Sequence, residues 1–352
     1  MRVRIILTLA LLLGLSAAGT VAQGDQLQVF GAYLDALRVQ ARIPGLSAAI
    51  LRDGEIVWER GFGYSNVERQ VAATPDTPYR IASLTKTFTS TLLLRCVEEG
   101  RLDLDEPIAR YSTAIPEAGA TVRHVLSHTS QAPPGSAFRY DGNRFAALTA
   151  VVDACTAQPF RQALSTSILD RLAMRDSVPG QDLESPSDET SRMFDAATLA
   201  RYRSVISRLA TPYVLQPDGN LRRADFPPKI INASAGLIST VRDLARYDAA
   251  LDAGVLLQPD SLALAWSPFV SNRGAFLPYG LGWFVQETTG VRVIWHYGQW
   301  EQYSSLYIKL PASHATLILL ANSGELSTRF NLAGGDITES PFARLFLRMF
   351  AS

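Results

Sequence analysis

The stretch IASLTKTFTSTLLLRCVEEG, residues 81–100, decides the fold and carries the most informative motif of the chain. From Thr85 to Glu99 it has the apolar spacing of a helix, and Gly100 is typical of the residue that follows a helix end. Apolar side chains at helical spacing, among them Phe88 and Leu92, predict that this helix is buried in a core. Polar side chains at its beginning are therefore expected at the edge of that core.

Ser83 and Lys86 stand one helical turn apart at this beginning, so their side chains are expected on one face. A serine hydroxyl becomes a nucleophile when a nearby base takes its proton, and burial lowers the pKa of a lysine toward that role. The free N–H groups of a helix start can hold an oxyanion. The alternative is that Ser83 caps the helix and Lys86 is solvated. With three lysines in the chain, a chance Ser-x-x-Lys is expected about once in four such sequences.

Strand patterns lie on both sides of the motif. An amphipathic helix is predicted over 25–42, and two strands within 46–64, joined at Asp53-Gly54, predict a β-hairpin. The region 101–271 is mixed helix and loop. Further strands are predicted at 280–286, 291–296, 304–310 and 316–322, followed by a helix at about 341–350. The predicted fold class is α/β of the α+β kind: one antiparallel sheet built from both chain ends, flanked by the terminal helices, with a mostly helical insertion.

Composition excludes several classes of protein. The chain has 352 residues, 47% hydrophobic and 19% charged, with a formal net charge of zero. It is therefore not expected to be disordered or to bind nucleic acid. Two cysteines and four scattered histidines show no metal-ligand spacing, and neither a metal nor an organic cofactor is expected. Cys96 and Cys155 form a disulfide or are buried free thiols, and the sequence does not decide between the two.

The first 22 residues have the pattern of a signal peptide. A cationic start, Met1 to Arg4, precedes an apolar run over 5–15 and small residues up to Ala22, after which cleavage is expected. An uncleaved N-terminal anchor is the alternative. The mature protein is predicted to be one domain over 23–352, periplasmic or secreted, with no later membrane span.

The segment around Ser83 and Lys86 resembles the active-site helix of the penicillin-binding-protein-like serine hydrolases. This family includes class C β-lactamases, D-alanyl-D-alanine carboxypeptidases and related esterases and aminopeptidases. The resemblance covers about 43–322, because further family landmarks follow in order at 44–47, 60–64, 124–130, 234–240 and 279–283. It implies a β-lactamase/transpeptidase-like fold, with a sheet lobe at about 25–80 and 275–352 and a helical lobe at about 81–274.

The resemblance also implies a Tyr-x-Asn element, in which the tyrosine exchanges protons and the asparagine orients the substrate amide. Tyr140 matches the tyrosine, and a phenol beside an ammonium is expected to ionise more easily than usual. The asparagine position holds Gly142, and Asn143 could substitute only if the loop shifts. This departure puts in doubt the recognition of a β-lactam or peptide amide. The alternative for Tyr140 is a core tyrosine with a bonded hydroxyl.

The third family element is a Lys-Thr-Gly or His-x-Gly strand, which His296, Tyr297 and Gly298 match in its histidine form. The resemblance implies that the N–H of Gln299 joins that of Ser83 in an oxyanion hole. Gly298 is then expected to let the strand approach the substrate. A structural histidine is the alternative for His296.

Two neighbouring stretches complete the comparison with the family. The bulky segment 299–302 replaces a small, glycine-rich one, and Trp300 and Gln302 are expected to narrow or fill the pocket. His124 and His128 are assigned to structure, in a turn remote from the chemistry.

The predicted function is that of a serine hydrolase which forms an acyl-enzyme on ester, amide or lactam substrates, small molecules or peptides. A true β-lactamase or D-alanyl-D-alanine carboxypeptidase is the first alternative, which Gly142 and the bulky 299–302 segment disfavour. A catalytically weak cell-wall peptide-binding protein is the second. Retention of Ser83, Lys86 and Tyr140 disfavours it, because a binder has no need of a proton-transfer set. The sequence leaves the natural substrate and the oligomeric state open.

Overall fold

The computed structural model describes residues 24–131, 133–225 and 230–351. The predicted signal peptide and Lys229 lie outside these residues.

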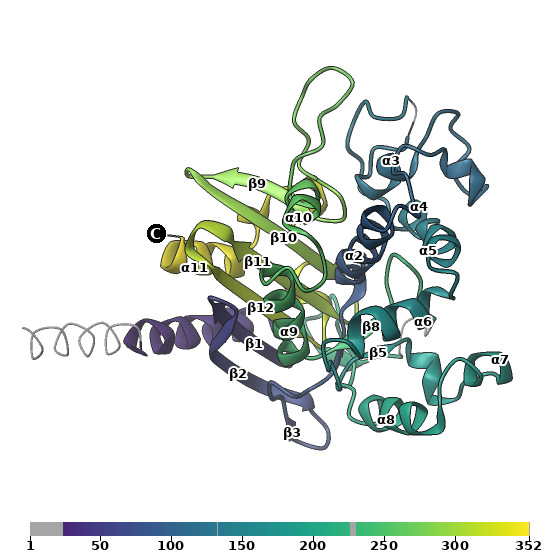
Figure 1. The fold of residues 1–352 in the computed structure, drawn as a ribbon. Coiled ribbons are helices and arrows are strands. Elements are labelled where there is room, and N and C mark those ends of the chain that lie inside the picture. The colour runs from purple at the N-terminus through teal and green to yellow at the C-terminus, as the bar shows by residue number, and fades with distance from the viewer. Residues whose placement is uncertain (1–23, 132, 226–229, 352) are drawn as a thin grey trace, which may run out of the picture.

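A seven-stranded antiparallel sheet, in the order β3-β2-β1-β12-β11-β10-β9, forms the frame of the molecule (Figure 1). Its strands are β1 (Gly45–Arg52), β2 (Glu55–Asn66), β3 (Val71–Ala72), β9 (Phe284–Thr288), β10 (Val291–Gln299), β11 (Ser304–Leu310) and β12 (Ala315–Ala321). The N-terminal strand β1 pairs with β12, with Leu46 opposite Ala321. The sheet is thus assembled from both chain ends, which confirms the predicted fold class.

Two smaller sheets accompany it. One has the order β4-β8-β5 and the other pairs β6 with β7. Their strands are β4 (Tyr79–Arg80), β5 (Val178–Pro179), β6 (Tyr213–Leu215), β7 (Leu221–Arg223) and β8 (Leu237–Ser239).

A helix over 24–40 opens the described chain. The others are α2 (Thr85–Glu98), α3 (Val122–Leu126), α4 (Gly142–Phe145), α5 (Leu148–Thr156), α6 (Phe160–Leu164), α7 (Asp188–Ser191), α8 (Ala196–Ile206), α9 (Val241–Asp252), α10 (Pro259–Ala265) and α11 (Pro341–Phe350). In Figure 1 the large sheet lies on one side of α2, and α3, α4, α5 and α6 lie on the other.

The strands β1, β10, β11 and β12 are buried on both faces because alternate strand residues enter two different cores, whereas β2 and β3 keep exposed residues. On one face, Ile50 and Leu319 pack with the terminal helices, where Phe30 lies against Phe350 with ring centroids 5.5 Å apart. On the other face, Ile318 packs toward α2 and α9. Helix α9, which comes from the insertion, lies directly on β1 and β12. Helix α2 is therefore held between the large sheet and the helices α5 and α6.

The hairpin and the strand boundaries follow local backbone chemistry. Asp53 and Gly54 adopt positive φ angles of 52° and 79°, as a tight two-residue hairpin requires. The strand predicted over 280–286 begins only at Phe284. The preceding residues form a turn, in which Gly280 N–H donates to Trp283 O at 2.8 Å, so they are unavailable for the ladder.

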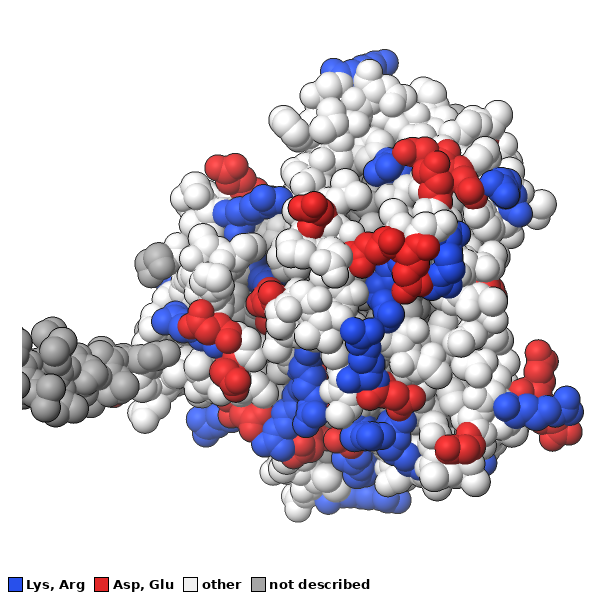
Figure 2. All heavy atoms as spheres, in the orientation of Figure 1, with Lys and Arg blue, Asp and Glu red and all other residues white. Residues whose placement is uncertain are grey.

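Charged side chains of both signs are interspersed on the face drawn in Figure 2, as expected for a chain of zero net charge. None of the helices in the described residues is both long and apolar enough to cross a membrane.

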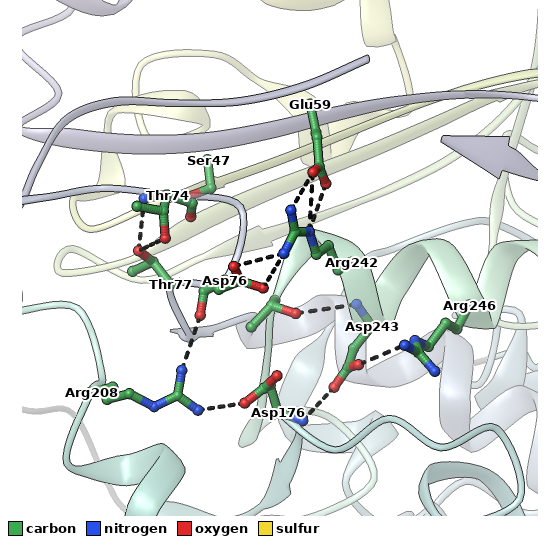
Figure 3. Close-up of polar contacts among 11 residues, drawn as sticks. Ser47, Glu59, Thr74, Asp76, Thr77, Asp176, Arg208, Arg242, Asp243 and Arg246 are labelled. Atoms are coloured by element: carbon green, nitrogen blue, oxygen red, sulfur yellow. Dashed lines mark hydrogen bonds and ion pairs between the residues drawn. The ribbon is translucent and has the colours of Figure 1, made fainter. Parts of the chain in front are cut away.

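Arg242 on α9 links segments that are far apart in the sequence (Figure 3). Its guanidinium binds Glu59 on β2, with Nε 2.9 Å from Oε2, and Asp76 ahead of β4, at 2.7 Å. Arg208 pairs with Asp176 in the same network. The Arg242 pairs attach β2 and the segment ahead of β4 to α9.

Cys96 and Cys155 form a disulfide, with Cα atoms 6.0 Å apart. The bond joins α2 to α5, and it settles the pairing that the sequence left open.

Candidate active site

Ser83 lies in a 3₁₀ turn, Ala82–Leu84, that leads directly into α2. Ala82 has a positive φ of 49°, which is rare for a residue with a Cβ and marks a strained turn. The Thr85 hydroxyl donates to Ala82 O at 2.7 Å and helps to fix this conformation. Ser83 keeps partial solvent exposure while both its neighbours are buried, so its hydroxyl is presented at the edge of the core.

Lys86 lies on the same side of the helix start as Ser83, with Nζ 2.9 Å from Ser83 Oγ. Its side chain is fully buried. Burial lowers the pKa of Lys86 to about 7, and Asp141 opposes this effect only in part. No carboxylate of the described residues lies within ion-pair distance of the ammonium. A substantial fraction of Lys86 is therefore neutral near pH 7, the form that can accept a proton.

Two contacts from another part of the chain hold the lysine. Ser234 offers both its carbonyl oxygen, 3.1 Å from Lys86 Nζ, and its hydroxyl oxygen, at 3.0 Å. Sequence reasoning named Ser234 only as the start of a family landmark and gave it no role at the site.

Tyr140 lies beside the lysine, with Lys86 Nζ 5.1 Å from the centre of its ring. Its hydroxyl is shielded from solvent and makes no hydrogen bond of ordinary length with the described residues. Burial raises the pKa of Tyr140 well above its usual value, followed by the effect of Tyr297, while Ser83 lowers it. The expectation of an easily ionised phenol is therefore wrong: near neutral pH this group keeps its proton.

Gly142 occupies the position that faces the site. A Cβ at this residue would lie 3.1 Å from Ser234 Oγ and 3.7 Å from Lys86 Nζ. Asn143, one residue further, is exposed at the start of α4, and its backbone N–H is bound to Asp141 Oδ1 at 2.9 Å. The structure thus places position 142, and not position 143, against the lysine.

Strand β10 brings His296, Gly298 and Gln299 to the same region. His296 is fully buried, with Nε2 2.9 Å from the Tyr279 hydroxyl and Nδ1 2.7 Å from Tyr297 O. Its ring centre is 6.2 Å from that of Tyr140. Burial, and then the nearby Lys86, hold the pKa of His296 well below its usual value, so it is a neutral group near the lysine.

Gly298 allows β10 to pack against the backbone that precedes the nucleophile. A Cβ at this position would lie 2.2 Å from Ile81 O, a distance that no side chain tolerates. The close approach is therefore to the Ile81–Ala82 segment. The predicted approach to the substrate is not tested by this contact.

Gln299 is the last residue of β10 and is exposed. In an antiparallel ladder the N–H groups of successive residues point to opposite edges of the strand. Trp300 N–H donates to Tyr303 O at 2.9 Å, so the N–H of Gln299 points away from β11. The N–H of Gln299 is therefore not used in the β10–β11 ladder, and its place in an oxyanion site with the N–H of Ser83 stays a prediction. The Trp300 side chain lies over the Arg80 guanidinium, 4.3 Å from ring centre to Cζ.

His128 is closer to the site than the sequence suggested. Its ring centre is 4.4 Å from that of Tyr140, and its Nδ1 accepts a hydrogen bond from Asp141 N–H at 3.2 Å. Its carbonyl accepts from Arg139 N–H at 2.9 Å. The assignment of His128 to a remote turn is wrong, because it holds the segment that carries Tyr140. His124 has a structural role, because it completes the capping box of α3 with Thr121.

The described residues contain no group of three or more His, Cys, Asp or Glu side chains arranged to bind a metal ion. A partly exposed serine beside a buried, partly neutral lysine and a protonated tyrosine defines a site of the serine-hydrolase type. With the mixed fold, the arrangement is that of the β-lactamase/transpeptidase-like class.

The comparisons with known proteins agree with this class. The sequence profile of the Beta-lactamase family matches residues 24–336, and the chain belongs to that family. Among curated proteins, the chain is 24% identical to penicillin-binding protein 4* of Bacillus subtilis (strain 168) over 310 residues, 77% of this chain and 66% of that protein. It is 23% identical to protein flp of Staphylococcus aureus (strain MW2), over 80% of this chain and 60% of that one. The chain thus spans less than two thirds of the length of these relatives.

Two solved structures show the same fold. The D-amino acid amidase from Ochrobactrum anthropi SV3 superposes with a TM-score of 0.73 at 24% identity, over 93% of this chain and 99% of that one. The octameric penicillin-binding protein homologue from Pyrococcus abyssi superposes with a TM-score of 0.72 at 23% identity, over 85% and 74%.

Proposed function

We propose that the protein is an acyl hydrolase that forms a covalent acyl-enzyme on Ser83. The observation that carries the proposal is the 2.9 Å contact between Ser83 Oγ and the fully buried Lys86, which burial makes a base near neutral pH. A structural lysine would gain nothing from burial without a carboxylate, since burial of an unpaired ammonium is costly.

In the proposed reaction, Ser83 Oγ attacks the carbonyl carbon while its proton passes to Lys86 Nζ. The oxygen of the tetrahedral intermediate is held by the N–H groups of Ser83 and Gln299. Tyr140, which keeps its proton at neutral pH, donates that proton to the leaving group as the carbon–heteroatom bond breaks. Lys86 returns its proton to Tyr140, and water then releases the acyl group from Ser83.

Amides and esters are the proposed first substrates. The amidases that resemble the chain over nearly their whole length act, by their names, on D-amino acid amides or as D-stereospecific amidohydrolases. Gly142 removes the amide that relatives use to grip a β-lactam or peptide side chain, which disfavours the β-lactamase or carboxypeptidase alternative. A binding protein is disfavoured because it needs no neutral lysine beside a serine.

The test is covalent labelling of the purified protein with a fluorophosphonate and with a fluorescent penicillin. We expect fluorophosphonate labelling of the wild type and its loss in Ser83→Ala. Ser90→Ala is the matched control, because Ser90 lies on the same helix but is bound to Leu281 O at 2.6 Å. Stable penicillin labelling would favour the cell-wall alternative, and absence of Ser83-dependent labelling by either probe would contradict a hydrolase.

We further infer that the chain is exported to the periplasm or the medium. The signal-like pattern over 1–22 supports this, and so does the Cys96–Cys155 disulfide, since disulfides persist in oxidising compartments. Cell fractionation followed by N-terminal sequencing is expected to find an exported chain that begins at Gln23. A cytoplasmic chain that retains Arg2 would contradict the inference.

A further inference from the structure

The position that carries an asparagine in the family pattern, two residues after the tyrosine, is Gly142 here, and a Cβ at this position would lie 3.7 Å from Lys86 Nζ. Gly142 has no side chain to offer, yet Lys86 Nζ is fully buried and needs hydrogen-bond partners there. The only side-chain oxygens that contact this Nζ within the described part of the chain are those of Ser83 and Ser234. The Ser234 carbonyl oxygen is also 3.1 Å from Nζ. Because Ser83 is the proposed nucleophile, the contacts that hold the amine come from Ser234.

Ser234 is placed at the lysine by a tight turn. Asn232 Oδ1 accepts from Ser234 N–H at 2.8 Å and from Ala235 N–H at 3.2 Å. The turn is bound to the elements that carry the site. Thr89 on α2 donates to Ala233 O at 2.7 Å, and Thr149 Oγ1 on α5 accepts from Ala233 N–H at 3.0 Å.

The hydroxyl of Ser234 also lies where an asparagine side chain would begin. A Cβ at position 142 would stand 3.1 Å from Ser234 Oγ, closer than most Cβ contacts allow. An asparagine at 142 and a serine at 234 therefore compete for one space beside Lys86. In this chain position 142 has no side chain, and the hydroxyl of Ser234 lies beside Lys86 in its place. We call this replacement the exchange.

We propose that Ser234 is the positioning residue for Lys86, replacing the missing asparagine, and that the exchange leaves the site without an amide for the substrate. The proposal rests on the proposed function of Ser83 and Lys86. A hydroxyl can accept from the ammonium form of Lys86 and donate to its neutral form, so it can hold the lysine through both halves of the proton transfer. The Ser234 carbonyl supplies only an acceptor.

Removal of the hydroxyl has a predictable electrostatic effect. Lys86 is faced by Asp141 ahead of α4, by Tyr140 and His128 in the neighbouring loops, and by His296 on β10. All of these stay in place in Ser234→Ala. The variant loses an acceptor that stabilises the charged form of Lys86, so the pKa of Lys86 is expected to fall. The rise of the labelling rate with pH, its acid limb, is therefore expected to move to lower pH.

The experiment is a double-mutant cycle on the full chain, with Ser234→Ala, Gly142→Asn and the two together, read as the rate of fluorophosphonate labelling of Ser83 against pH. Ser234→Ala is expected to lower the plateau rate about tenfold, the effect of one hydrogen bond to a charged group. It is also expected to shift the acid limb downward. Gly142→Asn alone is expected to be slow as well, because its side chain meets Ser234 Oγ. The double variant is expected to label Ser83 at a rate within about threefold of the wild type, with the acid limb back at its wild-type pH.

A merely structural Ser234 would change the folded fraction but leave the pH limb unchanged. Additive effects in the cycle, or an unmoved limb in Ser234→Ala, would overturn the proposal. If the wild type still shows normal Ser83-dependent labelling, either of these outcomes contradicts only the role of Ser234 and not the proposed function. Absence of labelling in the wild type would instead contradict the proposed function.

Discussion

Two of the three lysines of the chain are buried in the described structure, and they are buried in opposite ways. Lys86 meets hydroxyl and carbonyl oxygens, with no carboxylate in ion-pair contact among the described residues. Lys309 on β11 contacts Asp248 at 2.9 Å and Asp252 at 2.7 Å, both on α9. The first arrangement favours a neutral amine. The second pairs the amine with two carboxylates. Burial alone therefore does not indicate the role of a lysine. Its hydrogen-bond and ion-pair partners indicate it.

The largest expected effect comes from the same substitution at both positions. Lys86→Arg keeps the positive charge but cannot accept a proton, so we expect fluorophosphonate labelling to fall by roughly 10²- to 10⁴-fold. Lys309→Arg keeps what Lys309 supplies, a cation beside two carboxylates, and is expected to label at the wild-type rate per folded molecule. Equal labelling rates for the two variants would remove the distinction between the lysines.

The second prediction concerns stability. Lys309→Met leaves Asp248 buried without its cation, and we expect the free energy of unfolding to fall by about 3–5 kcal/mol. Lys86→Met removes a group with no carboxylate partner and is expected to change stability far less. Urea denaturation followed by circular dichroism measures both. In Lys309→Met with Asp248→Asn, part of the loss should be recovered. A larger loss at Lys86 than at Lys309 would reverse the comparison.

The third prediction is a pH dependence of stability. Burial lowers the pKa of Lys86 from 10.5 to about 7 in the folded chain. Between these values the unfolded chain holds a proton that the folded chain has released, so this group makes the free energy of unfolding rise with pH. Below about pH 7 both states are protonated and the contribution is flat. Urea melts from pH 6 to 9.5 are expected to show a steeper rise in the wild type than in Lys86→Met. Parallel curves would show that Lys86 keeps its charge when folded.

The smallest effect is expected at an exposed ion pair. Arg242 pairs with Glu59 and Asp76 (Figure 3), but its side chain is 44% exposed. Exposed pairs contribute about 1 kcal/mol or less and weaken with salt. Arg242→Ala should therefore lower the free energy of unfolding slightly in dilute buffer and by less still in 0.5 M salt. A loss as large as that of Lys309→Met would show that the network is more shielded than its exposure indicates.

The sequence predicted the fold well because the fold depends on local patterns. The strand signals at 304–310 and 316–322 marked β11 and β12 within a residue at each end, and the Asp53-Gly54 turn marked the first hairpin. The start of β9 was missed because glycines turn the chain just before it. The disulfide stayed open because the distance between α2 and α5 is a matter of tertiary packing.

The sequence predicted only those contacts of the site that lie within a single motif. Ser83 and Lys86 are three residues apart, so their contact can be foreseen from helix geometry. Ser234 is 148 residues from Lys86, and its contact depends on a turn that the sequence does not reveal. The available signal was Gly142, which leaves the asparagine position of the family pattern without a polar side chain. The state of Tyr140 was predicted wrongly because its burial outweighs the effect of its neighbours.

The central claim is that neutral Lys86 takes the proton from Ser83. The most direct measurement is the rate of Ser83 labelling by a fluorophosphonate across pH 5 to 9, in the wild type and in Lys86→Arg. The wild-type rate is expected to rise through an inflection near pH 7, the value to which burial lowers the pKa of Lys86, and the inflection should vanish in the slow variant. A wild-type rate that is flat across this range, or a Lys86→Arg rate with the same inflection and magnitude, would contradict the account.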